Sequence, residues 1–347
     1  MIFPKPQSIL ALVFGLSLAM ASPLHAVRAA SLPLPSRTIF QLNETDTWFE
    51  NIAVRANGDL LVTMLQPAAT VYTLKQPYSS SPEFSIVHTF DNANGTLGIV
   101  ETSPDVFLVV SGQFSSLAVP VPGSLVAWEL SLVDPEPTVR EIVSFADIEL
   151  ANGLTKVPTD DDSNIVLVAD SVAGSVWRFD FNTGAHEVVL HTEEMAPVPN
   201  ATTISLGING VHFRDGYLYF SNSDLLTIYR VRFDQQGYPA PNATVDIVAT
   251  IDAVPVDDFT IDRKGYLWAA TNFDNKVVAI RPDGSSVVVA GGLTELTVAG
   301  DTADAFGRTQ DDFHVLYVVT GGGLASPVNG TITEPAKIVA INTAGFE

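Results

Sequence analysis

The sequence lacks cysteine altogether, although it has 347 residues. The protein therefore cannot form a disulfide bond, a cysteine nucleophile or a thiolate metal site. A chain of this length without covalent links must be held together by its apolar core and by its topology. Also absent are the G-x-S-x-G pattern of serine hydrolases and the H-E-x-x-H pattern of zinc proteases.

Basic residues are scarce as well. Lys and Arg together number 17, against 39 Asp and Glu, which gives a formal net charge of -22. A surface of this sign repels the phosphates of nucleic acids and of anionic lipids. We therefore expect no nucleic-acid partner.

Long apolar runs are missing except near the start of the chain. The apolar segment Ser8–Ala21 follows Lys5 and ends in Ala19-Met20-Ala21, which is the pattern of a cleaved signal peptide. The run is too short to span a membrane stably. We predict a signal peptide over 1–21, no membrane span, and passage through the secretory pathway to the exterior, a vacuole or another lumen.

Asn-x-Ser/Thr sequons favour the same route. Such sites are glycosylated in proteins that pass through the eukaryotic secretory pathway. The predicted glycosylation sites are Asn43, Asn94, Asn200, Asn242 and Asn329.

The sequence also shows no helical periodicity. It shows a repeating pattern of short strands instead. Short strands rich in Val, Ile and aromatics, bounded by Gly, Asp and Asn, recur about every 50 residues. A typical unit is "NGVHFRDGYLYFSNS", which begins at Asn209. The six units begin at Glu50, Leu97, Asn152, Asn209, Asp257 and Thr302.

This repeat predicts an all-β fold, a six-bladed β-propeller of four-stranded antiparallel blades that forms one domain over 36–347. A sandwich, or two smaller β domains, is the competing architecture, but the regular recurrence argues against both. We expect the early segment Ser36–Leu42 to complete the last blade beside Lys337–Asn342. That closure would remove an exposed sheet edge.

The six opening residues should form a ring, because the innermost strands of a propeller surround its central channel. We call these residues the channel ring. Its members Glu50, Asn152, Asn209 and Asp257 offer two carboxylates and two amides. Such hard oxygen ligands suit Ca²⁺ or another divalent cation. Asn and Asp are also common turn residues before strands, so their shared position in the repeat is what favours a site.

At these residues the chain resembles the senescence-marker protein / gluconolactonase family of six-bladed propellers. The resemblance lies in Glu50, in the "NG" pairs at Asn152 and Asn209, and in the pattern D-x-x-x-I-D-x-x-G-x-L-W from Asp257. It implies metal ligation by Glu50, Asn152, Asn209 and Asp257, although the adjacent Asp258 leaves a shift by one residue open. Sugar lactonases have an arginine where this chain has Leu150, so the resemblance does not extend to a hydroxyl-rich substrate.

The stretches "TWFENIAVRANGDLLVT", "VLVADSVAGSVWRFD" and "TGGGLASPVNGT" look like a fungal branch of this superfamily. That branch includes hetero-Diels–Alderases of tropolone–sesquiterpenoid biosynthesis. The resemblance implies loss of water from a hydroxymethyl tropolone and addition of the resulting quinone methide to an alkene of a humulene-type macrocycle. Such a reaction requires no cofactor, and its substrates are small, apolar and aromatic.

A cycloaddition needs an apolar channel mouth that places two reactants and excludes water. We expect Glu50 or Asp257 to act as the general acid of the dehydration. The predicted substrate contacts at the same mouth are Leu97, Phe114, Leu150, Asn222 and Asn272. A metal-dependent lactonase, with Asp257 as base, and a non-catalytic binding propeller are the alternatives, and the choice between monomer and homodimer stays open.

Overall fold

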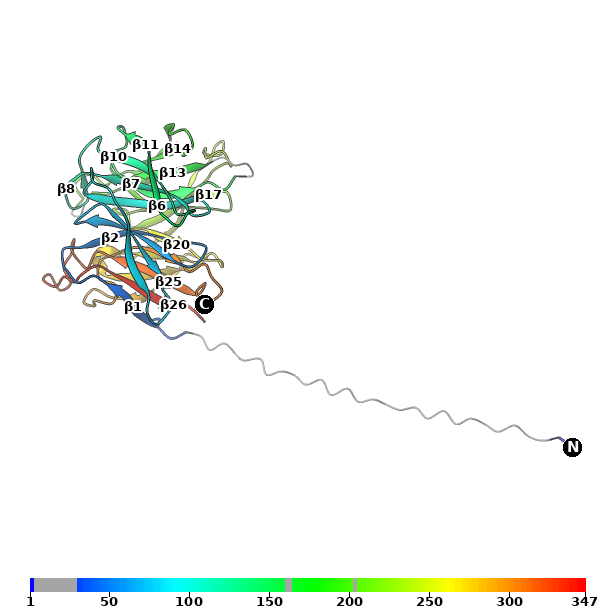
Figure 1. Ribbon diagram of the computed structural model, residues 1–347. Coiled ribbons are helices and arrows are strands. Elements are labelled where there is room, and N and C mark those ends of the chain that lie inside the picture. The colour runs from blue at the N-terminus through cyan, green and yellow to red at the C-terminus, as the bar shows by residue number, and fades with distance from the viewer. Residues whose placement is uncertain (3–29, 160–163, 202–204) are drawn as a thin grey trace.

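The computed structural model describes residues 1–2, 30–159, 164–201 and 205–347. Nearly all of the predicted signal peptide, 1–21, lies outside these residues. The described chain forms six four-stranded antiparallel sheets and one short hairpin (Figure 1). The predicted six-bladed β-propeller is confirmed.

Each blade runs outward from a strand at the central channel. The strands of the first three blades are β2 (Trp48–Val54), β3 (Leu60–Gln66), β4 (Thr70–Lys75) and β5 (Glu83–Thr89); β6 (Gly95–Ser103), β7 (Val106–Gly112), β10 (Leu125–Ser131) and β11 (Thr138–Phe145); and β12 (Ala151–Lys156), β13 (Ile165–Asp170), β14 (Ser175–Asp180) and β15 (His186–His191). Blade two also carries the hairpin of β8 (Phe114–Ser116) and β9 (Val119–Pro120).

The last three blades follow the same order. Their strands are β16 (Ile208–Arg214), β17 (Tyr217–Asn222), β18 (Thr227–Arg232) and β19 (Val245–Thr250); β20 (Phe259–Ile261), β21 (Leu267–Ala270), β22 (Lys276–Ile280) and β23 (Ser286–Gly291); and β24 (Asp301–Phe306), β25 (Val315–Thr320), β26 (Lys337–Asn342) and β1 (Ser36–Gln41). Apart from the single-turn 3-10 helices η1 (Glu193–Met195) and η2 (Asn272–Asp274), the described residues contain no helix. None of them forms a helix that could cross a membrane.

The sixth blade joins the two ends of the propeller, as the sequence predicts. Strand β1 pairs antiparallel with β26, from Ser36 opposite Ile341 to Gln41 opposite Lys337. Figure 1 shows β1 beside β26 near the carboxyl end of the chain. This pairing closes the ring of blades by backbone hydrogen bonds and covers an edge strand that would otherwise be open.

The apolar core lies in layers between the blades. Its largest fully buried side chains include Trp268, Tyr317, Phe49 and Phe220. Phe220 packs with the inner strands of blades three and four, and Trp268 packs between blades five and six. Because every blade buries both faces against its neighbours, the blades depend on one another for their stability.

Several innermost strands share a pairing irregularity at the channel ring. The register shifts between Phe49 and Ile52 in β2, and between Ala151 and Leu154 in β12. The same shift occurs between Ile208 and Val211 in β16. A bulge of this kind changes the direction of a side chain. It leaves the ring residue out of the ladder and free to face the channel.

Glycine after the ring residue lets neighbouring innermost strands approach closely. A Cβ atom on Gly153 would lie 2.3 Å from the Asn209 carbonyl oxygen, and one on Gly210 would lie 2.1 Å from Asp258 Oδ1. Neither distance is compatible with a real side chain. The "NG" pairs in the sequence thus combine a polar side chain for the channel with a glycine that makes room for the next blade.

Gly153→Ala should therefore destabilise the protein by about 1–3 kcal/mol, because the added methyl group forces β12 and β16 apart. Chemical denaturation of both proteins measures the difference. Gly292→Ala is the matched control, since its nearest contact would be an ordinary 3.7 Å to the Glu295 side chain. Equal stability of the two variants would show that the close approach at Gly153 is unimportant.

Candidate active site

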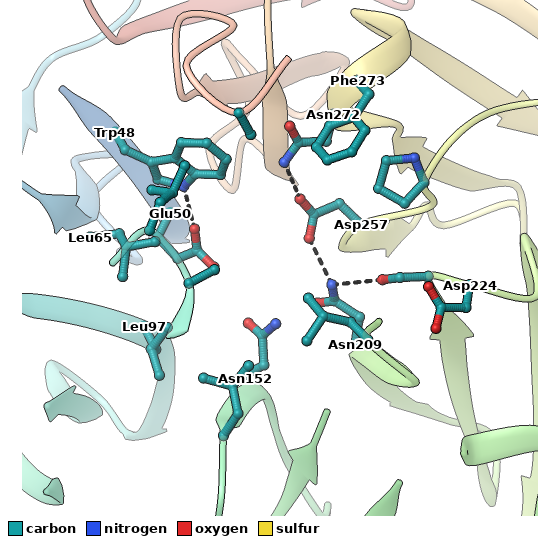
Figure 2. Close-up of a pocket in the computed structure, with 17 residues that line it drawn as sticks. Trp48, Glu50, Leu65, Leu97, Asn152, Asn209, Asp224, Asp257, Asn272 and Phe273 are labelled. Carbon is teal, nitrogen blue, oxygen red and sulfur yellow. Dashed lines mark hydrogen bonds between the residues drawn. The ribbon is translucent and has the colours of Figure 1, made fainter. Parts of the chain in front are cut away.

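A cavity of about 200 Å³ lies at the end of the channel where the innermost strands begin (Figure 2). Side chains from all parts of the chain converge on it. Its polar lining residues are Glu50, Asn152, Asn209, Ser223, Asp224, Asp257 and Asn272. Its apolar lining residues are Trp48, Leu65, Leu97, Leu117, Ala118, Leu150, Leu206, Pro255, Phe273 and Ala325. The cavity thus has a polar floor and apolar walls.

The four oxygen-bearing members of the channel ring meet at this floor. Figure 2 shows Glu50 and Asp257 facing each other across the cavity, with Asn152 and Asn209 nearby. Each of the four comes from a different blade and each is buried. The geometric prediction made from the repeat is therefore correct for these residues.

Two amides hold the Asp257 carboxylate. Asn209 Nδ2 donates to Asp257 Oδ1 at 2.9 Å, and Asn272 Nδ2 donates to Asp257 Oδ2 at 2.7 Å. Asn209 Nδ2 also donates to Ser223 Oγ at 3.0 Å, and Ser223 in turn donates to the Val256 carbonyl. Both N–H groups of Asn209 are thus used, which leaves its carbonyl oxygen as the atom available to a ligand.

Glu50 has a different partner. The Trp48 indole N–H donates a hydrogen bond to Glu50 Oε2. Burial raises the pKa of Glu50 to about 8, and the Asp257 charge adds to the rise, while the Trp48 hydrogen bond opposes it. Burial likewise raises the pKa of Asp257 to about 7, although the hydrogen bond from Asn272 opposes the rise. One proton can therefore reside in this pair near neutral pH.

The next residue, Asp258, points to other partners. It accepts a hydrogen bond from Asn51 Nδ2 at 2.9 Å, and its Oδ1 lies 3.1 Å from His212 Nε2. Of the two adjacent aspartates, Asp257 lines the cavity and Asp258 does not. The alternation of adjacent side chains on an extended backbone explains the difference.

Further carboxylates lie buried along the channel. Neither oxygen of Asp304 has a hydrogen-bond partner among the described residues, and the same is true of Asp301 Oδ1. Burial raises the pKa of both groups well above the usual range. The charge of Asp258 contributes to the shift at Asp304. Removal from water thus raises the pKa of several carboxyl groups in this acidic protein.

The walls contain three of the predicted substrate contacts. Leu97, Leu150 and Asn272 all line the cavity. Leu150 is fixed by its backbone N–H, which donates to Asp170 Oδ1 at 3.0 Å. Leucine at this position gives a substrate apolar contact and no hydrogen bond, so the wall suits a hydrocarbon or aromatic surface.

Two predicted contacts, Phe114 and Asn222, lie outside the cavity lining. Asn222 is fully buried, and its Nδ2 donates to the carbonyls of Glu194 and Ala196, both at 3.0 Å. Its Oδ1 accepts from the backbone N–H groups of Asp224 and Leu225, so the amide anchors a loop. Phe114 begins the β8 hairpin, where Asn94 holds its backbone.

The ring is also incomplete at the sixth blade. Thr302 does not line the cavity, because its hydroxyl donates to the Phe49 carbonyl at 2.8 Å. Sequence reasoning missed Trp48, Leu117 and Phe273. Trp48 could have been found, since residues two apart on a strand share a face and Glu50 was already assigned. Leu117 and Phe273 lie on loops whose paths no repeat specifies.

The floor has a donor set that fits a hard cation. Glu50 and Asp257 supply carboxylate oxygens, and the carbonyl oxygens of Asn152 and Asn209 complete the set. Among the described residues, no cluster of three or more His, Asp or Glu could hold a metal ion. Any ion here would therefore depend on the two amides.

All five predicted glycosylation sites are exposed at the surface. Asn94 differs from the others in that its side chain is engaged. Its Oδ1 accepts from the Phe114 backbone N–H at 2.7 Å, and its Nδ2 donates to the Phe114 carbonyl at 2.9 Å.

Comparison with known proteins places this chain in a family. No family model matches the chain. It is 31% identical over 348 residues to the "Putative hetero-Diels-Alderase asR5" of Sarocladium schorii, covering 92% of this chain and 86% of the relative. It is 34% identical over 321 residues to a "Putative hetero-Diels-Alderase" of a Phoma species, covering 86% and 89%. The chain belongs to the fungal hetero-Diels-Alderase family.

Solved structures support the fold assignment of this hetero-Diels-Alderase family member. A calcium-binding regucalcin of Agrobacterium tumefaciens superposes with a TM-score of 0.63 at 14% identity, covering 92% of this chain and 98% of that one. A gluconolactonase of Xanthomonas campestris superposes with a TM-score of 0.57 at 14% identity, covering 91% of each chain. At these identities the likeness establishes the propeller fold alone.

The buried carboxyl groups predict how stability depends on pH. Their folded-state pKa values are raised, so the folded protein binds more protons than the unfolded chain above the ordinary carboxyl pKa near 4. With a chelator present to keep metal ions away from these groups, the free energy of unfolding should therefore fall as pH rises from about 4 to about 8. Denaturation at several pH values measures this.

Asp304→Asn should reduce that fall, because it removes one raised pKa without removing bulk. Asp283→Asn, at a fully exposed turn, is the control and should leave the slope between pH 5 and 8 unchanged. An increase of stability over this range, or an equal slope in Asp304→Asn and the unmodified protein, would contradict the assignment.

Proposed function

We propose that this protein is a hetero-Diels–Alderase that joins a quinone methide, formed from a hydroxymethyl tropolone, to an alkene of a humulene-type macrocycle. The observation that carries the proposal is the cavity itself, in which two protonatable carboxyl groups face each other beneath apolar walls. The family relationship supports the reaction class. The secretory route predicted from the leader is part of the proposal, and five exposed sequons support it.

The walls supply the placement that a cycloaddition requires. The reacting carbon and oxygen atoms of a quinone methide must meet the two alkene carbons in near-attack geometry, and no proton moves in that step. Orientation of this kind can contribute on the order of 7–11 kcal/mol to lowering the barrier. Leu97, Leu150 and Phe273 offer apolar surface for both reactants and exclude the water that would add to a quinone methide.

The polar floor supplies the proton transfers that form the quinone methide. Protonated Glu50 donates its proton to the hydroxymethyl oxygen, the C–O bond breaks, and water leaves. The ring hydroxyl gives its proton to the Asp257 carboxylate, the electrons of that O–H bond form the carbonyl C=O bond, and ring π electrons shift to form the exocyclic C=C bond as the C–O bond breaks. The balance is one water lost, with the Glu50 proton leaving in that water and the ring-hydroxyl proton taken up by Asp257. Raised pKa values of about 8 for Glu50 and about 7 for Asp257 suit these opposite roles.

Glu50→Gln should lower turnover of the hydroxymethyl tropolone by roughly 10²- to 10⁴-fold, because the general acid is lost. Product formation measured by chromatography checks this. Rates of the unmodified enzyme should fall below about pH 7 and above about pH 8, since Asp257 must be ionised and Glu50 protonated. Exposed Glu83→Gln is the matched control and should behave as the unmodified enzyme.

A chemically generated quinone methide separates the two steps. Glu50→Gln should cyclise it at the unmodified rate, because no proton transfer remains. Loss of this activity would assign Glu50 to substrate placement, and full activity of Glu50→Gln on the hydroxymethyl precursor would exclude it as the acid.

The oxygen donors of the floor favour one second candidate, a lactone hydrolase. In that function Glu50, Asn152, Asn209 and Asp257 would hold a divalent cation such as Ca²⁺, which supplies Lewis acidity toward a lactone carbonyl. Asp257 would then accept the proton of the attacking water. The apolar side chain of Leu150 weighs against sugar lactones as substrates.

A chelator distinguishes the two candidates. Turnover to cyclised product should be unchanged after exhaustive dialysis against EDTA, because proton transfer and placement need no ion. A panel of lactones should show no hydrolysis before or after addition of Ca²⁺. Calcium-dependent hydrolysis, or cyclisation abolished by EDTA and restored by Ca²⁺, would overturn the cofactor-free mechanism.

A further inference from the structure

A second cavity adjoins the active-site cavity. It measures about 550 Å³, against about 200 Å³ for the first, and the two share Ala118 and Leu206 as lining residues. We call it the side groove. Its apolar lining includes Val119, Pro120, Ala146, Ile148 and Val172.

The β8–β9 hairpin lines both cavities. Leu117 and Ala118, at its tip, line the active-site cavity, while Ala118, Val119 and Pro120 line the side groove. The hairpin is held at its base, where Phe114 pairs with Pro120 and the Val121 N–H donates to the Gln113 carbonyl at 2.7 Å. Among the described residues, blade two alone carries such an extra strand pair.

The segment 146–150 leads from the side groove into the active-site cavity. Residues 146–149 line the groove, and Leu150 lines the cavity. The buried carboxylate of Asp170 fixes this segment by accepting hydrogen bonds from the backbone N–H groups of Glu149 at 2.8 Å and Leu150 at 3.0 Å. The same carboxylate accepts from the Val172 N–H at 3.3 Å. The two cavities are therefore held in a fixed relation.

The chemistry of the side groove differs from that of the catalytic floor. Its charged members, Asp147 and Glu149, are exposed at the rim, and none of the Lys, Arg or His residues that the structure describes lines it. The groove therefore offers an anion no cationic partner. Its volume lies within the range of about 300–1,000 Å³ typical of small-molecule pockets, whereas the active-site cavity lies below it. A neutral, hydrocarbon-rich molecule is the ligand that such a surface suits.

We propose that the side groove is the subsite for the apolar, alkene-bearing reactant, and that the active-site cavity receives the hydroxyl-bearing reactant. The alkene reaches the reacting carbon at the junction formed by Ala118 and Leu206. This assignment rests on the proposed two-substrate function. It makes the β8–β9 hairpin and the segment 146–150 the determinants of which alkene is accepted.

Binding of humulene to the unmodified protein, measured by equilibrium dialysis without tropolone, tests the assignment. Ala146→Trp should weaken binding by about 10-fold or more, because the indole fills the groove from an exposed position. Exposed Ala185→Trp, remote from both cavities, is the matched control and should bind humulene normally. Glu50→Gln should also bind normally, because it alters the other cavity.

Val119→Asp gives a second variant, since this 47% exposed side chain can accept a charge without disturbing the core. It too should weaken humulene binding. Unchanged binding in both groove variants, or no humulene binding by the unmodified protein, would overturn the assignment. Cyclised product is assayed in the same preparations. Humulene binding lost in the groove variants without any product from the unmodified enzyme would refute the proposed function, and would leave the groove as an apolar binding site only.

Discussion

The structure depends on how closely its innermost strands crowd around one axis. The carbonyl of Asn209 lies where a Cβ atom of residue 153 would be, and Asp258 lies where a Cβ atom of residue 210 would be. Glycine at these positions lets the blades close into a ring narrow enough for side chains from opposite blades to share one small cavity. The bulges at the same positions direct those side chains inward. Without this crowding, Glu50 and Asp257, which lie on different blades, would be too far apart to line one small cavity.

Crowding also accounts for the chemistry of the floor. Burial removes both carboxyl groups from water and raises the pKa values of Glu50 and Asp257 toward neutrality; the charge of Asp257 adds to the rise at Glu50, and that of Asp258 adds to the rise at Asp257. Hydrogen bonds then make the pair unequal. Asp257 has two amide donors and Glu50 has one indole donor, so the former ionises first. Two carboxyl groups with pKa values near neutrality thus result from one ring of equivalent positions.

The propeller and the walls of its cavity have separate origins. The fold is shared with calcium-binding and lactone-hydrolysing proteins at 14% identity, whereas much of the apolar wall, including Leu117, Leu206 and Phe273, comes from loops and from the β8–β9 hairpin. Leu150 gives this wall an apolar surface in place of a hydrogen-bonding group. Selection of a reaction thus depends on a few wall residues, while the crowded strands keep the floor in place.

The sequence by itself determined the six-bladed propeller, the closure by Ser36–Gln41 and the register that brings Glu50, Asn152, Asn209 and Asp257 together. Strand periodicity and repeat spacing carry this information locally. In a propeller, residues at the same position of each repeat lie at the same height along the central channel. Only the tertiary structure decided that Asp257 and not Asp258 faces the cavity, that Asn222 anchors a loop, and that Trp48 bonds to Glu50. Those outcomes depend on bulges and loop paths, which are set by contacts between distant segments and leave no period in the sequence.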